Sequence, residues 1–297
     1  MKTNIKKKLR FICFIIAIAM MKQTANSQPY LDLFNSRYSY SPNTGSGSET
    51  NVPVKMQYFN FSANLPIRFK KSGDAILINP FVETWMIHWP GKEYEDRCLR
   101  GYALPIGYLK NFNHSRFSLL GMVIPRINME KYSDVGHLDF FQFGGFLLGS
   151  FKVNDKLVLK AGGYYNKEFF GPLFIPLLGV DWKISDKENL FGTLPNQLVY
   201  ERKLNSKLYA GAITRFITNS YGMIYKDEYL RIDENQLGVF ADFYPAKKLV
   251  INLEFGHSIL RKLREGLRSD VGTSSINLDP KDNFYMKLSL AYRIRFR

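Results

Sequence analysis

The end of the chain alternates apolar and polar residues without a break. In FYMKLSLAYRIRFR, residues 284–297, every even position is apolar, and the odd positions from 287 onward are Lys, Ser, Ala or Arg. A period of two puts these sets on opposite faces of a β-strand. At about 3.3 Å per residue the run covers about 40 Å, well beyond a globular strand of about 5–6 residues. Tilted by about 40°, it would cross an apolar band about 25 Å tall, as in a membrane barrel.

Other segments repeat the alternation, and short polar turns separate them. The pattern is clean in 58–69, 102–108, 174–184 and 249–256, whereas 75–89, 115–125 and 137–151 are blurred on both faces. Turn sequences such as FKKSGDAIL, FKVNDKLVL and RKLNSKLYA mostly recur about every 40 residues, which suits one hairpin of two spanning strands plus a longer loop. Short turns at one end and longer loops at the other are typical of outer-membrane barrels.

These segments predict an all-β fold, namely a transmembrane antiparallel up-and-down β-barrel of about 14 strands. An even number places both ends of the barrel on the periplasmic side. Twelve strands is the alternative, because the segment PYLDLFNSRYSYS and the short hairpin at 189–204 have the weakest strand patterns. A secreted soluble β-barrel that binds a ligand inside remains a third class, because soluble strands also alternate.

The start of the chain predicts export. MKTNIKKKLR is strongly basic, the apolar run FICFIIAIAMM follows, and small residues precede Gln28. This is the pattern of a cleaved secretory signal peptide, and its apolar run is too short to span a membrane as a helix. We therefore expect a signal peptide over residues 1–27 and one barrel domain over 28–297, located in the cell outer membrane.

Composition and charge narrow the partners. Aromatic residues make up 15 % of the chain, and the net charge is +15. The predicted signal peptide holds six Lys or Arg and no acid, which leaves +9 on the mature protein. These basic residues are spread over turns and strands, so nucleic-acid binding is not expected, and outer-membrane lipid is the expected partner. Cys98 would be the single cysteine left, so no intrachain disulfide is expected.

Long motifs in the second half carry a family resemblance. GGYYNKEFFGPLFIPLLGVDWKISDKENLFGTLPNQLVYERKLNSKLYAGAI and YLRIDENQLGVFADFYP, with their paired Pro-Leu segments and Asp-Trp before a turn, lie within residues 157–297. This half resembles an uncharacterised outer-membrane β-barrel family of diderm bacteria, known as a domain of unknown function. The resemblance implies the location and the fold, and it brings no catalytic residue with it.

The final strand also resembles an assembly signal. Ser289, Ala291, Ile294 and Phe296 follow the order of a polar residue, a small residue and two apolar residues that the barrel-assembly machinery reads, with Ala in the usual place of Gly and Arg297 after the aromatic. We therefore expect that machinery and periplasmic chaperones as partners during biogenesis.

The polar strand faces supply the candidate functional residues. Lumen-facing candidates are Arg68, Lys160, Asp181, Lys183, Arg215, Glu254, Lys287, Arg293 and Arg295, and the same faces carry Glu168, Glu201, Lys203 and Asp242. One interpretation is a pore lined by both signs of charge. The other is an ion-pair network that fills a narrow lumen, because barrels of about 8 strands are filled and those of about 16–18 hold a water channel.

A barrel enzyme acting on lipid is the alternative function. His88, His137 and His257 are expected near loop-side strand ends, where a Ser nucleophile such as Ser220 would need a His partner. His257 and Ser258 are adjacent, so they point to opposite faces of a strand and cannot form a dyad.

No metal site or cofactor is expected, although Asp233 and Glu234 on a loop flank leave Ca²⁺ as an option. The sequence thus favours a passive channel, a solute-uptake component or a structural envelope protein that is not an enzyme, and it does not identify the solute.

Overall fold

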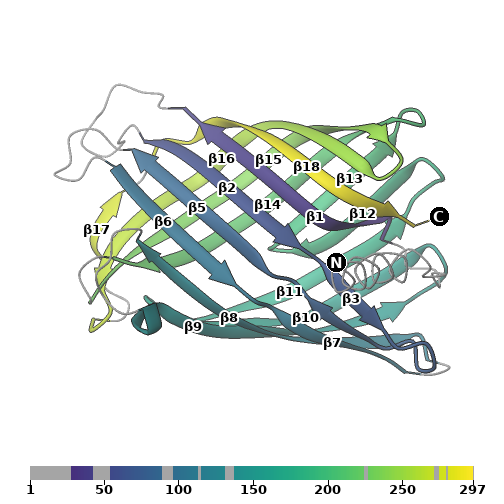
Figure 1. Ribbon diagram of the computed structural model, residues 1–297, viewed down its shortest axis with the longest axis horizontal. Coiled ribbons are helices and arrows are strands. Elements are labelled where there is room, and N and C mark those ends of the chain that lie inside the picture. The colour runs from purple at the N-terminus through teal and green to yellow at the C-terminus, as the bar shows by residue number, and fades with distance from the viewer. Residues whose placement is uncertain are drawn as a thin grey trace, which may run out of the picture.

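The computed structural model describes residues 28–42, 54–88, 96–112, 115–130, 137–223, 227–270, 274–278 and 280–296. The predicted signal peptide and His114 lie outside these ranges. The described residues form one antiparallel sheet that closes on itself (Figure 1). No helix among them is long and apolar enough to cross a membrane.

Strand segments follow one another around the barrel in chain order. They are β1 (Tyr30–Ser41), β2 (Lys55–Ala63), β3 (Leu65–Arg68), β4 (Ala75–Ile78), β5 (Phe81–His88), β6 (Asp96–Ala103), β7 (Ile106–Asn111), β8 (Phe117–Glu130), β9 (Phe141–Lys152), β10 (Leu157–Glu168), β11 (Gly171–Lys183), β12 (Glu188–Leu194), β13 (Gln197–Lys203), β14 (Leu208–Gly222), β15 (Glu228–Ala246), β16 (Leu249–Leu267), β17 (Ser274–Leu278) and β18 (Asn283–Arg295). One short 3₁₀ helix, η1 (His137–Phe140), precedes β9.

The described segments make fourteen spanning strands, because four of these strands are interrupted. Segments β2 and β3, β4 and β5, β6 and β7, and β17 and β18 each continue one another along the chain. Closure comes from β1, which pairs with β18 over Tyr30 to Tyr40 and with β2 on its other side. The prediction of fourteen strands is confirmed, including the first strand and the short hairpin β12–β13.

The two ends of the barrel differ. One end, the turn rim, holds the short turns at 69–74, 153–156, 184–187 and 204–207 together with the start of β1 and the end of β18. It lies to the right in Figure 1, beside the end of the chain marked C. The opposite end, the loop rim, includes one tight hairpin of its own, because β10 and β11 are joined by only two residues.

The two faces of the strands meet different surroundings. On β18, Phe284, Met286, Leu288 and Leu290 are all more than half exposed on the outside, whereas Arg293 on the other face is 5 % exposed. The same outward set includes Phe59, Phe174, Val239 and Leu253 on other strands. Large apolar side chains therefore form a continuous outer belt, and the ionic residues point inward, as the alternation predicts.

Strand lengths are uneven, and this matters for the site. Segments β15 and β16 each have 19 residues, whereas β12 and β13 have 7 each. The ladder of β11 with β12 ends at Leu178 and Leu194, and the ladder of β13 with β14 ends at Gln197 and Arg215. The hairpin β12–β13 therefore covers only the half of the barrel wall that is nearer the turn rim.

Cys98, the single cysteine outside the predicted signal peptide, lies within a strand. It belongs to β6, opposite Met86 of β5, and not to the preceding loop. It is a free thiol within the described chain. Segment β6 starts at Asp96 because Asp96 and Arg97 continue the ladder with His88 and Ile87 of β5.

The outer belt generates a stability prediction. Leu288 is 52 % exposed near the middle of β18. Leu288→Lys should lower the free energy of unfolding by about 2–4 kcal/mol, because a cation then faces hydrocarbon. Ser206→Lys, in the exposed turn before β14, should change it by less than about 0.5 kcal/mol. Denaturant unfolding in phospholipid vesicles measures both values, and equal effects would contradict the lipid-facing assignment of Leu288.

Asp74, in the β3–β4 turn, gives a pH prediction. Its carboxylate accepts hydrogen bonds from the backbone N–H of Asn111 at 2.8 Å, Lys110 Nζ at 3.0 Å and the Tyr108 hydroxyl at 2.8 Å. The Asn111 N–H is the largest cause holding the pKa of Asp74 well below its usual value. A depressed pKa stabilises the fold above the unfolded-state value of about 3.9, and this stabilisation is lost as the pH falls toward the folded-state value.

The stability difference between the wild type and Asp74→Asn should therefore be larger at pH 7 than at pH 3. Unfolding curves of both proteins at the two pH values measure it. A difference that stays constant with pH would show that the charge of Asp74 does not act in this way.

Candidate functional site: a chamber inside the barrel

Inward positions of the strands hold most of the predicted charged residues. Asp181, Arg215, Glu254, Lys287 and Arg293 are each less than 10 % exposed. Arg68 and Lys183 lie at the turn rim, where Lys183 pairs with Asp186 of the adjoining turn at 2.7 Å. Lys160 of β10 pairs with Asp181 of β11 at 2.6 Å. The predicted residues thus comprise one ion pair, two residues at the turn rim and two larger clusters around Glu254 and Arg293.

Glu254 is the centre of the first cluster. Arg215 Nη1 and Nη2 donate to its two carboxylate oxygens at 2.5 and 2.7 Å, and the Tyr285 hydroxyl donates to Oε1 at 2.7 Å. Lys287 Nζ donates to Oε2. Tyr285 reaches the carboxylate over Gly238, where an added Cβ would lie 2.5 Å from the tyrosine oxygen. Two cations therefore share one buried carboxylate, and its hydrogen bonds fix their positions.

Arg293 is the centre of the second cluster, nearer the turn rim. Its Nε donates to Asp32 Oδ1 and its Nη1 to Asp242 Oδ2, each at 2.5 Å. Its guanidinium lies 3.6 Å from the centre of the Tyr30 ring. Next to this cluster, Arg295 pairs with Glu201 of β13. These contacts join β1, β13, β15 and β18, so they hold the barrel wall together across its interior.

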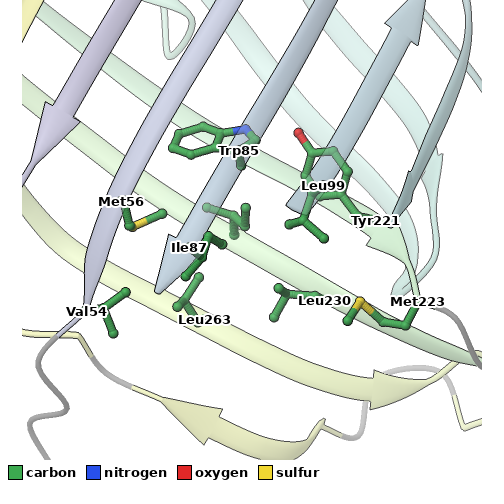
Figure 2. Close-up of a cluster of buried hydrophobic side chains, with 10 residues drawn as sticks. Val54, Met56, Trp85, Ile87, Leu99, Tyr221, Met223, Leu230 and Leu263 are labelled. Carbon is green, nitrogen blue, oxygen red and sulfur yellow. The ribbon is translucent and has the colours of Figure 1, made fainter. Parts of the chain in front are cut away.

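The loop-rim half contains an apolar cluster that the sequence did not predict. This apolar plug consists of Val54, Met56, Trp85, Ile87, Leu99, Tyr221, Met223, Leu230, Ile232 and Leu263. Figure 2 shows the side chains labelled there gathered inside the barrel, with Trp85 at one edge. Leu99, Leu230 and Ile232 have no exposed surface. The members lie in or next to β2, β5 and β6 on one side and β14, β15 and β16 on the other, so the plug joins opposite walls across the lumen at this level.

Polar contacts across the lumen accompany the plug. Glu83 of β5 accepts hydrogen bonds from the hydroxyl of Tyr58 at 2.8 Å and from that of Tyr221 at 2.6 Å. Tyr221 belongs to β14, which is far from β5 in the order of strands. The last residues of β14 stay paired with β15 up to Gly222, and they also reach the far side of the shortened strands, where Gly222 forms a parallel bridge with Met129 of β8.

A chamber of about 850 Å³ lies between the plug and the Arg293 cluster. Its lining includes four acidic and four basic side chains, namely Asp32, Glu83, Asp242 and Glu254 with Arg37, Arg215, Lys287 and Arg293. The lining residues of β8 to β11 are instead aliphatic or aromatic, namely Met122, Ile124, Phe146, Leu148, Tyr164, Ile175 and Leu177. The chamber thus has a charge-balanced ionic wall and an apolar wall.

This apolar lining explains the blurred strands. Segments 75–89, 115–125 and 137–151 place apolar residues on both faces, because their inward residues line the plug or the chamber. Examples are Trp85 and Ile87 in the plug and Met122 and Phe146 in the chamber. The sequence did contain a signal for this apolar lining: these strands carry apolar residues on both faces, whereas other strands alternate cleanly.

The serine and histidine candidates are held in other interactions. The Ser220 hydroxyl donates to Glu168 Oε2 at 2.6 Å and accepts from Gln142 Nε2 at 3.0 Å. Ser258 donates to Glu234. His257 packs edge-on against Phe284 on the outer surface, with ring centres 4.9 Å apart. His88 contacts Asp96 at 2.9 Å. The geometry described for Ser220 and Ser258 therefore pairs each with a carboxylate, and a lipid-hydrolase site is not supported.

Asp233 and Glu234 are each paired with arginine. Arg231 Nη2 contacts Asp233 Oδ1 at 3.0 Å, and Arg261 Nε donates to Glu234 Oε2 at 2.9 Å. They point to opposite faces of β15, so their carboxylates do not converge on one point.

The residues of the predicted assembly signal lie in or just after β18. Ser289 and Ala291 point inward and are nearly fully buried, whereas Ile294 and Phe296 are half-buried. The N–H of Phe296 donates to the carbonyl oxygen of Pro29 at 2.8 Å. Their role in assembly stays a prediction.

Comparison with known proteins identifies a family of matching sequences. The family model described as Domain of unknown function (DUF6268) matches residues 23–293. Among curated proteins, none matches this chain.

Several solved membrane barrels are similar in outline. An outer membrane channel from Pseudomonas putida F1 is 8 % identical, with a TM-score of 0.47 over 90 % of this chain and 96 % of that chain. The TodX monoaromatic hydrocarbon channel, as a deltaS2 mutant, is 9 % identical, with a TM-score of 0.43 over 92 % and 91 %. The translocator domain of autotransporter NalP from Neisseria meningitidis is 10 % identical, with a TM-score of 0.39 over 99 % and 98 %. The barrel architecture of this chain rests on its own strand pairing.

The Glu254 cluster predicts a large effect of one substitution. Glu254→Ala removes the carboxylate and leaves Arg215 and Lys287 buried side by side. Because uncompensated buried charge is costly, the free energy of unfolding should fall by about 3–5 kcal/mol. Asp186→Ala breaks the exposed pair with Lys183 and should cost less than about 1 kcal/mol. Denaturant titration of both variants in vesicles measures the contrast, and a small effect at Glu254 would contradict its central position.

Proposed function

We propose that this chain, which belongs to the Domain of unknown function (DUF6268) family, is a passive channel of the outer membrane with a solute chamber inside its barrel. The observation that carries the proposal is the chamber of about 850 Å³. Sites for small molecules in proteins are typically about 300–1,000 Å³. A barrel that served only as a filled structural element would not need an interior space of this size.

The lining argues for a solute without a large net charge. Four acids and four bases line the chamber. Arg215 and Lys287 pair with Glu254, and Arg293 pairs with Asp32 and Asp242. Their fields largely cancel at a distance, so the ionic wall would neither concentrate nor repel one sign of ion strongly. Hydrogen bonding and apolar contact would then select the solute.

The apolar plug is proposed as the gate. Hydrophobic constrictions close channels because water leaves them, and the plug joins opposite walls of the barrel at the loop-rim end of the chamber. In this proposal the solute passes when the plug rearranges, while the ion-pair clusters near the turn rim hold the rest of the wall rigid.

The proposed route to the membrane follows from the sequence. Residues 1–27 would direct export, and chaperones of the periplasm would deliver the chain to the barrel-assembly machinery. That machinery would read Ser289, Ala291, Ile294 and Phe296 in the last strand. The turn rim would then face the periplasm and the loop rim the exterior, in the usual orientation of such barrels.

A structural envelope protein is the second candidate, and the completeness of the plug favours it. Leu99, Leu230 and Ile232 are fully buried, and cations bridge several strands. A barrel of this kind would stiffen the membrane without passing solutes.

Opening the plug separates the two candidates. Leu99→Ser with Leu230→Ser places hydroxyls in the plug from opposite walls, which lets water enter and should raise the conductance of planar bilayers and the efflux of a small sugar from vesicles. Leu253→Ser, on the lipid-facing side of β16, is the matched control and should leave both values at the wild-type level. Heat-modifiable gel migration reports whether each variant is folded.

The wild type should show measurable flux and the double variant a larger flux. If the folded wild type and the folded double variant both fail to pass ions and sugar, the structural candidate replaces the channel. Release of fatty acid from the same vesicles, abolished by His257→Ala, would instead establish the lipid hydrolase.

A further inference from the structure

We infer that the chamber has a side opening into the lipid bilayer, between β11 and β14, and that it admits single-chain amphiphiles from the membrane. This inference names a ligand class and a route for the chamber, and it rests on the proposed function only in using the same interior space. Four observations carry it: a short hairpin, an edge adapted to lack a partner, a lining that reaches the outer face, and an amphipathic interior.

The short hairpin β12–β13 leaves two strands without a neighbour. Its ladders stop at Leu178 of β11 and Arg215 of β14. In the described ranges, residues 171–177 of β11 pair only with β10, and no strand lies between them and residues 217–221 of β14. Every other part of the wall at this level is continuous in its described strand pairing, so this is where the barrel can open sideways.

The free edge of β11 contains prolines at the positions where a partner strand would need donors. The N–H of Lys183 donates to the carbonyl oxygen of Lys156, and the β10–β11 register is unbroken. The backbone N–H and C=O groups of the odd-numbered residues of β11 therefore point toward β10. The backbone groups of the even-numbered residues point toward the opening, and two of these residues, Pro172 and Pro176, have no N–H. Only Phe174 keeps an N–H on that side between 172 and 177. Since an unsatisfied N–H is costly in hydrocarbon, this edge is suited to contact with lipid.

The lining of the chamber crosses from the inner to the outer face at this point. It includes Ile175 and Leu177, which point inward from β11, and also Phe216 and Thr218, which belong to the outward set of β14. Phe216 is 44 % exposed on the outside of the barrel. The hairpin tip, residues 195–197, completes the lining on the turn-rim side. A side chain that lines the chamber and is also exposed to the surroundings marks a passage between them.

The opening is bounded on the loop-rim side, so it leads to lipid and not along the lumen axis. There the end of β14 is held against β8, with Arg126 Nη1 donating to Asn219 Oδ1 at 3.2 Å and Asn128 Nδ2 donating to the Ser220 carbonyl at 3.1 Å. The β10–β11 turn folds over this segment, and the Phe170 ring lies 4.2 Å from the guanidinium of Arg231. Below this closure, Phe174 and Leu178 of β11 are each more than 65 % exposed in the outer belt.

The interior matches a molecule with an apolar chain and a polar head. The wall of β8 to β11, next to the opening, is aliphatic and aromatic, and the ionic wall stands opposite. Two buried donors on the chamber lining, Trp85 Nε1 and Arg215 Nε, have no hydrogen-bond partner among the described residues. A chain lying along Ile175 and Leu177 would place acceptor oxygens of the head group within the polar part. This geometry fits a single-chain amphiphile whose head carries acceptors.

Photocrosslinking from the bilayer tests the inference. The protein would be reconstituted in phospholipid vesicles that contain dodecylphosphocholine with a diazirine in its chain, and the adducts would be mapped by peptide mass spectrometry. We expect adducts on the inward residues Ile175 and Leu177 as well as on the outward residues Phe174 and Leu178. Adducts confined to outward residues of the belt would overturn the side opening.

Two substitutions change the opening in opposite directions. Leu177→Trp fills its inner side and should abolish adducts on Ile175 while those on Phe174 remain, whereas Phe216→Ala widens it and should raise the yield of inward adducts. Leu253→Trp, on the lipid-facing side of β16, is the control for an added indole. Heat-modifiable migration excludes misfolded samples, and if Leu177→Trp does not fold, Phe216→Ala decides: an unchanged inward yield contradicts the inference.

The crosslinking result can be distinguished from the result of the channel experiment. Sugar efflux and conductance report on passage through the lumen, and crosslinking reports on entry from the bilayer. Inward adducts without efflux would support the side opening and reject the channel. Efflux without inward adducts would support the channel and reject the side opening.

Discussion

The structure depends on satisfying backbone hydrogen bonds inside the sheet, because hydrocarbon offers no substitute for water. Closure of β1 on β18 removes the two edges that an open sheet would have. It also forces the side chains into two sets, since every residue points either to lipid or to the interior. The outer belt, the ionic clusters and the plug are all consequences of this division.

Inside the barrel, ionic residues and apolar residues occupy different levels along the barrel axis. Near the turn rim, Arg293 and Arg295 connect strands that lie apart, and aromatic rings such as that of Tyr30 cover the guanidinium groups. Near the loop rim, aliphatic side chains replace them, and the apolar plug brings opposite walls into contact there. The chamber lies between the ionic clusters and the apolar plug, which explains why it is lined by both kinds of residue.

Sequence reasoning anticipated the fold well because the barrel follows a local rule. A period of two assigns each residue of β18 to a face without any knowledge of the other strands, and polar turns divide the chain into strands. Contacts between side chains of different strands cannot be predicted in this way. Asp32 and Arg293 lie at opposite ends of the sequence, and their contact depends on closure and register, which alternation does not specify. The plug escaped prediction for a related reason, since inward apolar residues such as Leu99 look like a blurred pattern until the opposite wall is known.

The prolines at the free edge of β11 have a consequence for assembly between molecules. An unpaired strand edge normally offers a template on which a strand of another chain can add, and this is how sheets join into larger aggregates. Pro172 and Pro176 lack the N–H donors that such an added strand would need, so strand addition at this edge is disfavoured. The same two residues that suit this edge to lipid thus also disfavour sheet-to-sheet association of neighbouring barrels at this point.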